Sequence, residues 1–159
     1  TAGSRFRIRQ ATMQDVDTLV GIEENVYLSK PWNHAAFASD VGRPRDRLYL
    51  IASHDGHPVG YVGSSINWFD NDMHITNIGV IPEYQDMGLG TVLLSELKTF
   101  AIRHHVSSMS LEVRRGNLGA QRLYQRLGFR NIGINPDYYM DDHEDAVDMK
   151  MNLQDEGNQ

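Results

Sequence analysis

The chain has 159 residues, with 21 acidic and 15 basic side chains and a formal net charge of -6. This length is typical of one domain, so we expect a single domain over 1–159 with short polar tails at 1–5 and 154–159. The sequence has no cysteine, which excludes disulfides, thiolate zinc sites and cysteine nucleophiles and favours a cytoplasmic location. Apolar runs too short for a bilayer and an acidic balance predict neither a membrane nor a free nucleic acid as partner.

The hydrophobic period alternates between two and 3.6 along the first half of the chain, which indicates a mixed α/β fold. We predict a strand at 6–10 and a helix over 12–27 with Thr12 as its N-cap. A second short helix, capped by Asn33, is expected to run through Phe37 and to stop before Gly42 and Pro44. Strands are predicted at 47–53, 58–67 and 73–81, and Pro82 ends the last because proline cannot donate to a sheet ladder.

The second half follows the same alternation. A glycine loop leads into a helix with apolar residues at helical spacing over 92–101, and a strand follows at 108–114. Asn117 is expected to cap another helix, which Gly128 ends. Strands at 129–134 and 145–153 complete the predicted sheet.

The glycine loop, Gln85-x-x-Gly88-x-Gly90, lies between a predicted strand and a predicted helix. Glycines let the backbone approach a ligand closely, and a helix N-terminus offers free N–H groups, so the loop suits a phosphate. The P-loop is disfavoured because no Gly-Lys-Ser/Thr is present, and a dinucleotide fingerprint is disfavoured because Leu93 occupies the third glycine position. For an isolated glycine pair, a purely structural turn is the alternative.

The surrounding segments extend the pattern. The loop follows Ile78-Gly79-Val80-Ile81-Pro82, and later come Leu111-Glu112-Val113-Arg114, Asn117 and Leu123-Tyr124-Gln125-Arg126-Leu127-Gly128-Phe129. In this order and spacing they resemble the acetyl-CoA motif and the next segment of the GNAT superfamily of N-acetyltransferases. Pro31-Trp32, and Tyr138-Tyr139 followed by Glu144-Asp145-Ala146, resemble the RimI-type and related protein N-terminal acetyltransferases. The resemblance implies a mostly antiparallel sheet of six to seven strands, splayed at the acetyl-CoA site and flanked by about four helices.

The resemblance also implies two catalytic residues for direct attack of an amine on the acetyl thioester. Glu112 matches the general base, and an α-amine with a pKa near 8 needs only a modest base. Tyr124 matches the general acid, since a phenol stays neutral at pH 7 and can protonate a thiolate. The structural alternatives are a solvent-facing carboxylate on an alternating strand and a core aromatic, and the latter is compatible with the acid role.

For the cosubstrate, the resemblance assigns the backbone N–H of Val80, at a strand irregularity, to the thioester carbonyl. The backbone of 86–91 would meet the pyrophosphate. Asn117 would reach the pantetheine arm, although a plain capping role is equally open. The residues expected to bind acetyl-CoA are Ile78, Gly79, Val80, Asp86, Met87, Gly88, Leu89, Gly90, Thr91, Asn117 and Tyr124.

Charge is unevenly distributed. The family often has Arg or Lys where this loop has Asp86 and Met87, while the stretch 113–130 holds five arginines that either form a solvated face or meet the CoA phosphates. Six acids within 137–148 account for the whole net charge. Because the resemblance places Trp32, Tyr138 and Tyr139 around the acceptor entrance, we expect these acids to attract basic acceptors there.

Other signals are weaker. His54, His57 and His74 are interpreted as turn and strand-surface residues, and no metal site is expected. The leading hypothesis is acetyl transfer from acetyl-CoA to the N-terminal α-amine of a protein, possibly a basic ribosomal protein. The alternatives are acetylation of a small-molecule amine, such as a polyamine or an aminoglycoside, and a non-catalytic acyl-CoA sensor.

Overall fold

The computed structural model describes residues 6–26 and 32–153. Seven strands form one sheet in the order β1-β2-β3-β4-β5-β7-β6, and neighbouring strands run antiparallel except β4 and β5. The strands are β1 (Arg7–Gln10), β2 (Arg47–His54), β3 (His57–Asn67), β4 (Asp72–Val80), β5 (Ser108–Arg114), β6 (Arg130–Asn135) and β7 (Ala146–Asn152). The α-helices are α1 (Val16–Val26), α2 (His34–Val41), α3 (Leu89–Arg103) and α4 (Leu118–Leu127), with 3-10 turns η2 (Met13–Asp15) and η3 (Pro82–Tyr84). The predicted mixed fold and mostly antiparallel sheet are confirmed.

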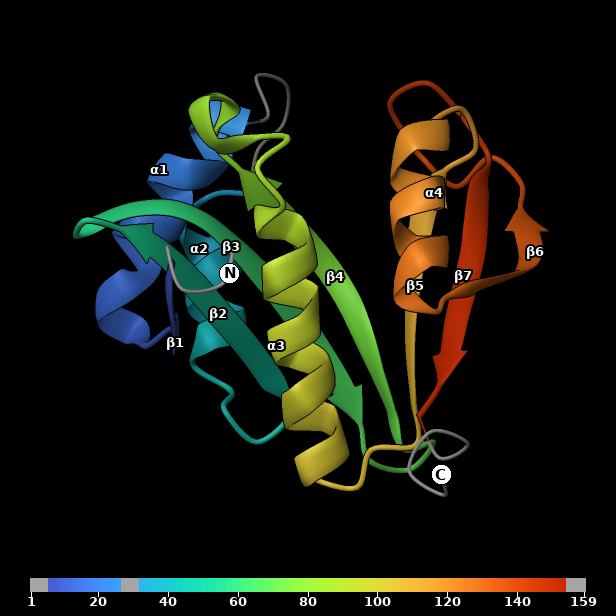
Figure 1. Ribbon diagram of the computed structural model, residues 1–159, viewed down its shortest axis with the longest axis horizontal. Coiled ribbons are helices and arrows are strands. Elements are labelled where there is room, and N and C mark those ends of the chain that lie inside the picture. The colour runs from blue at the N-terminus through green and yellow to red at the C-terminus, as the bar shows by residue number, and fades with distance from the viewer. Residues whose placement is uncertain (1–5, 27–31, 154–159) are drawn as a thin grey trace.

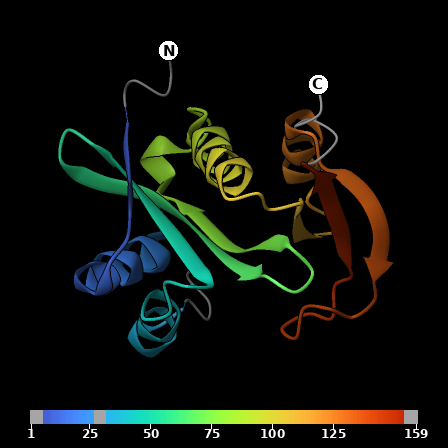
Figure 2. The ribbon, with the colours of Figure 1, turned by 90° about the horizontal axis from the view of Figure 1, so that it is seen from below.

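The two faces of the sheet are covered differently (Figure 2). Helices α3 and α4 lie on one face, over the larger apolar cluster, which includes Leu93, Leu97 and Met109. Helices α1 and α2 cover only β2 to β4 on the other face, around Phe37 and Tyr61. The α1/α2 face of β5, β7 and β6 therefore carries no helix in the described ranges, and the loop between β6 and β7 lies on that side.

The sheet opens between β4 and β5 (Figure 1). These strands pair only over 72–74 with 108–110 and then diverge. Ile81 N–H bonds to Val59 O at 3.0 Å, and successive N–H groups of a strand point to opposite sides, so the Val80 N–H points into the opening. The irregularity in β4 lies at Thr76, opposite the Gly63/Ser64 step, which is four residues earlier than the position expected at Val80.

Caps set the helix boundaries much as the sequence predicts. Thr12 and Asp15 form a capping box, but a 3-10 turn comes first and α1 begins at Val16. Asn33 accepts from Ala36 N–H, and α2 ends at Val41, directly before Gly42, as predicted. Tyr27 and Pro31 lie outside the described residues. No helix in the described part of the chain is long and apolar enough to cross a membrane.

Candidate active site

A groove of about 660 Å³ lies on the α3/α4 face, beside the opening between β4 and β5. The end of β4, the loop after it, the start of α3 and one side of α4 form its walls. Its lining residues are Val80, Tyr84, Gln85, Asp86, Gly88, Leu89, Gly90, Thr91, Asn117, Gly119, Ala120, Leu123 and Arg126. Seven of the expected cosubstrate residues line it, whereas Ile78, Gly79, Met87 and Tyr124 do not.

The loop before α3 presents backbone donors to this groove. Gly88 is in the left-handed region with φ 80°, and Asp86, at φ 66°, also takes that conformation. Gln85 Nε2 donates to Val80 O at 2.9 Å and so ties the loop to the end of β4. The first N–H groups of a helix have no partner within it, and the groove therefore suits an anion despite having no Lys or Arg over 85–91.

Tyr124 lies on α4 and packs against the larger apolar cluster. Its ring meets Phe129 at a centroid distance of 6.1 Å, and its hydroxyl makes no hydrogen bond to the described residues. Burial raises the pKa of Tyr124, so the phenol keeps its proton at neutral pH. Both sequence interpretations of Tyr124 are thus compatible with its place: a packed ring with an uncommitted donor.

Glu112 lies on the opposite face of the sheet, the one that α1 and α2 partly cover. Its Oε1 atom is 2.9 Å from His74 Nε2 and accepts a hydrogen bond of 2.9 Å from the Tyr138 hydroxyl. The Glu112 side chain is 21% exposed and that of His74 is 33% exposed. Glu112 is therefore neither a free surface carboxylate nor a buried unpaired one.

The pairing shifts both protonation equilibria. Burial opposes ionisation of Glu112, but the hydrogen bond and charge of His74, with the Tyr138 hydrogen bond, outweigh it and lower the pKa of Glu112. The hydrogen bond to Glu112 is the main cause of a raised pKa at His74. Asp148 faces Glu112 in the β5/β7 register, and burial followed by the Glu112 charge raises the pKa of Asp148.

His74 is on strand β4 and partly exposed, as expected of a strand-surface residue, but it also belongs to a polar network that the sequence analysis did not predict. His74 Nδ1 also lies 2.8 Å from Ser110 Oγ, and Ser110 donates to Asp72 at 2.5 Å. The signal was present in the sequence: Asp72 and His74 on one strand, and Ser108, Ser110 and Glu112 on another, alternate at period two and so share a face. His54 and His57 lie at the β2/β3 turn, and the described residues contain no cluster of three or more side chains that would hold a metal.

A second polar group lies on the face of the sheet that α1 covers. The Tyr61 hydroxyl donates a short hydrogen bond to Glu23 and accepts from Asn77 Nδ2 at 3.1 Å. Glu23 is only 3% exposed, and burial raises the pKa of its carboxyl. Gly79 faces the same ring: a Cβ there would lie 2.8 Å from Tyr61 Cε1.

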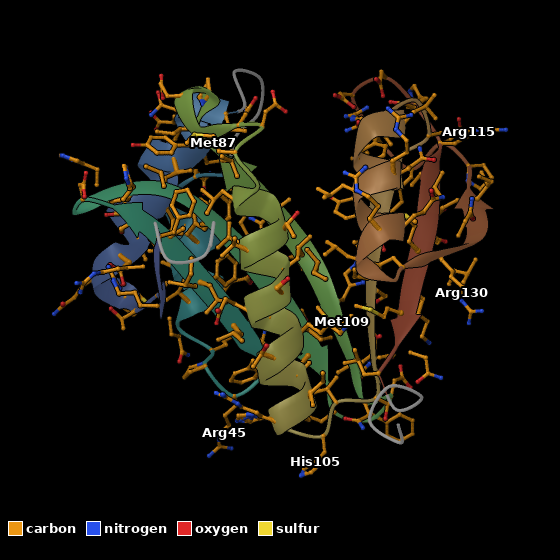
Figure 3. All side chains as sticks on the ribbon, viewed as in Figure 1. Arg45, Met87, His105, Met109, Arg115 and Arg130 are labelled. Carbon is orange, nitrogen blue, oxygen red and sulfur yellow. The ribbon has the colours of Figure 1, made fainter. Side chains whose placement is uncertain are left out.

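Four of the five arginines within 113–130 divide between three places, and only one of these places is the groove. Arg114 and Arg115 bind acids of the β6/β7 loop, Arg126 lines the groove, and Arg130 lines a separate pocket with Lys150. Figure 3 shows Arg130 beside β6, far from Met87 in the glycine loop. Arg114 and Arg115 pair with four of the six acids within 137–148, so their two positive charges offset part of the segment's negative charge.

The predicted acceptor residues come from two elements. Tyr138 and Tyr139 meet edge to face at 5.0 Å, beside Glu112. Trp32 is half-buried against Phe37 of α2, with ring centroids 5.4 Å apart. Pro31, which precedes it, lies outside the described residues.

Comparisons with known proteins identify the family of the chain. The family model of the acetyltransferase (GNAT) family matches residues 16–129. The chain is 34% identical to a putative ribosomal protein bS18-alanine N-acetyltransferase of Bacillus subtilis over 92% of this chain and 95% of that protein. It is also 34% identical to the N-alpha-acetyltransferase RimI of Mycobacterium tuberculosis over 87% of each chain. The crystal structure of the ribosomal-protein-S18-alanine N-acetyltransferase from Escherichia coli superposes with a TM-score of 0.85, at 29% identity, over 93% of this chain and 94% of that one.

Proposed function

Because the chain belongs to the acetyltransferase (GNAT) family, we propose that it transfers an acetyl group from acetyl-CoA to the N-terminal α-amine of a protein. Relatives named for ribosomal protein bS18 and its N-terminal alanine make a ribosomal protein the first acceptor to test, and a cytoplasmic location is part of the proposal. One observation carries the proposal: the opening between β4 and β5 has a phosphate-suited groove on one face and the Glu112–His74 pair on the other.

The groove residues fit acetyl-CoA. When bound, this cosubstrate supplies an activated acetyl thioester. The N–H groups at the start of α3 would hold its phosphates, with Arg126 as the cation among the groove-lining residues. The Val80 N–H points into the opening, where it would stabilise negative charge on the thioester oxygen.

The Glu112–His74 pair would receive the proton of the acceptor amine. An α-amine has a pKa near 8, so part of it is already unprotonated at neutral pH. The lowered pKa of Glu112 makes this carboxylate a weak base by itself. The raised pKa of His74 brings the pKa of the pair closer to that of the amine. We assign proton removal to the pair, directly or through one water.

Tyr124 would donate the proton that the departing CoA sulfur needs. It lies on the α3/α4 face and Glu112 on the opposite face, so acid and base approach the opening from opposite sides. This separation suits direct transfer, in which the amine enters from one face and the thiol leaves on the other. The sequence offers no cysteine for an acyl-enzyme.

A panel of acceptors tests the proposal. The protein is incubated with acetyl-CoA and, separately, with a peptide that begins with alanine, its N-terminally blocked counterpart, a polyamine and an aminoglycoside. We expect turnover with the free peptide alone. Faster turnover of the polyamine or aminoglycoside would favour a small-molecule acetyltransferase, and CoA binding without any turnover would favour a sensor.

A further inference from the structure

The guanidinium of Arg114 is surrounded by the segment that joins β6 to β7. Arg114 ends β5, two residues after Glu112 and on the same face. Its Nη1 atom donates to Asp142 at 2.9 Å and to Glu144 at 3.1 Å, and its Nη2 atom donates to Asp141 at 3.2 Å. The Tyr139 ring lies 4.0 Å from the guanidinium carbon, a cation–π distance. Three carboxylates and one ring thus converge on a single cation.

Because of these contacts, we expect Arg114 to contribute more to the order of this segment than an ordinary surface arginine would. An isolated exposed ion pair contributes little to stability. Here, however, three carboxylates are held close together, and residues 137–148 include no Lys or Arg to separate them. Without the guanidinium, these like charges would repel one another and the segment would move apart. A planar guanidinium with five N–H donors can satisfy all three, which an ammonium cannot do with the same geometry.

Glu144 extends the attachment to the start of α4. Its Oε2 atom accepts a hydrogen bond of 2.8 Å from the Gly116 N–H, in the turn between β5 and α4. Within the segment, His143 N–H donates to Tyr139 O at 2.8 Å and Tyr139 N–H donates to Glu144 O at 3.2 Å. The segment therefore folds on itself and is fastened to β5 and the β5/α4 turn through Arg114 and Glu144, and at its end through Arg115 and Asp145.

The same segment also contacts Glu112, the proposed catalytic carboxylate. Tyr138 is next to Tyr139, and its hydroxyl donates to Glu112. We propose that Arg114 is a positioning residue, which fastens the 137–145 segment to β5 and thereby holds the Tyr138 hydroxyl on Glu112 at the acceptor side of the opening. The kinetic consequence rests on the proposed function, but the structural consequence does not.

Arg114→Met and Arg115→Met form a matched pair for the test. Arg115 is its neighbour, but it is 62% exposed and binds only Asp145. Hydrogen exchange of 137–145 should be clearly faster in Arg114→Met than in Arg115→Met, which loses one side-chain contact to Asp145 but keeps the Arg115 N–H bond of 3.0 Å to Asp145 O. This comparison does not need turnover. Equal exchange in the two variants would overturn the proposal.

Kinetic measurements then distinguish loss of the Tyr138–Glu112 contact from a general loss of order in the protein. Arg114→Met should lower kcat/KM for the acceptor peptide about tenfold, the loss expected for one displaced hydrogen bond to a charged group, with KM for acetyl-CoA within twofold of wild type. It should also move the acidic limb of the pH profile upward, because Glu112 loses the Tyr138 donor. Arg114→Lys should recover only part of the loss.

A double-mutant cycle decides whether Arg114 acts through Tyr138. In a Tyr138→Phe background, Arg114→Met should reduce kcat/KM by less than a further twofold and leave the acidic limb where Tyr138→Phe puts it. An undiminished tenfold loss in that background would contradict the proposed route. If the wild type acetylates no amine at all, the proposed function fails, while the exchange comparison still tests the attachment.

Discussion

His74 Nε2 and Glu112 Oε1 lie 2.9 Å apart, just beyond the last pairing of β4 with β5. His74 is the last β4 residue in register with β5, and Glu112 is two residues past its partner Ser110. The contact therefore spans the strands at the point where the sheet begins to open. The contact with His74 holds the Glu112 carboxylate at the base of the opening and favours its charged form.

Replacing His74 should change the pH dependence of acetylation. In His74→Gln, Glu112 is left as the base without the raised pKa of His74, so the acidic limb of kcat/KM moves to lower pH. His57→Gln, at the exposed β2/β3 turn, is the control and should leave the limb in place. Steady-state rates between pH 4 and 9 measure this, and an unmoved limb in His74→Gln would remove His74 from the proposed proton transfer.

The same pair should contribute stability over a limited pH window. The Glu112 pKa is below its ordinary value of 4.5, so its contribution is present above that value and is lost as pH falls through the folded pKa. The His74 pKa is above its ordinary value of 6.5, so its contribution is present below that value and is lost as pH rises through the folded pKa. Urea unfolding of wild type and His74→Gln should differ most between the two ordinary values. A difference independent of pH would contradict the ion pair.

Glu112→Gln and Tyr124→Phe should each reduce turnover by roughly 10²-fold or more, the range for loss of a general base or acid. Neither side chain lines the groove, so the dissociation constant of CoA should stay unchanged. Calorimetry measures binding and a thiol-release assay measures turnover. Wild-type turnover in both variants would show that the catalytic assignment is wrong.

Gly79→Ala should destabilise the protein by about 1 to 3 kcal/mol, the usual cost of overpacking. The added Cβ would lie 2.8 Å from Tyr61 Cε1, and the ring cannot retreat easily because Glu23 and Asn77 hold its hydroxyl. Gly21→Ala, within α1 and with open space around it, should instead stabilise by about 0.5 to 1 kcal/mol. Chemical denaturation compares the two, and a neutral Gly79→Ala would show that Tyr61 does not restrict this position.

Asp15→Asn should lower the free energy of unfolding at pH 7, and lower it much less near pH 2. Asp15 accepts two hydrogen bonds from Arg9 and one from the Thr12 N–H, which together lower its pKa to about 2. A carboxylate with a lowered pKa stabilises the folded protein above its ordinary pKa, and this contribution is lost as pH falls. Asp15→Asn should therefore lower the free energy of unfolding at pH 7 by about 1 to 2 kcal/mol. Denaturation at both pH values checks this; an equal cost at each would exclude an ionic contribution.

Much of the fold follows from local signals. The capping residues Thr12, Asn33 and Asn117, the helix-ending Gly128 and the strand-ending Pro82 all mark boundaries near those observed, because each satisfies or removes backbone hydrogen bonds locally.

The polar partners were harder to predict. His74 and Glu112 are 38 residues apart, and Arg114 is 27 residues from Asp141, so both contacts depend on strand order. Arg114 falls within a basic stretch and Asp141 within an acidic one, and nothing local shows that the two stretches neutralise each other. Register, which sequence composition does not encode, decides these pairings.

The most direct test of the proposed function is the position of the transferred acetyl group. A peptide with an N-terminal alanine and an internal lysine is incubated with acetyl-CoA and either wild-type protein or Glu112→Gln, and the product is sequenced by tandem mass spectrometry. We predict acetyl on the alanine nitrogen, formed by the wild type and strongly reduced in the variant. Acetyl on the lysine side chain, or equal α-amine acetylation by both proteins, would contradict the account.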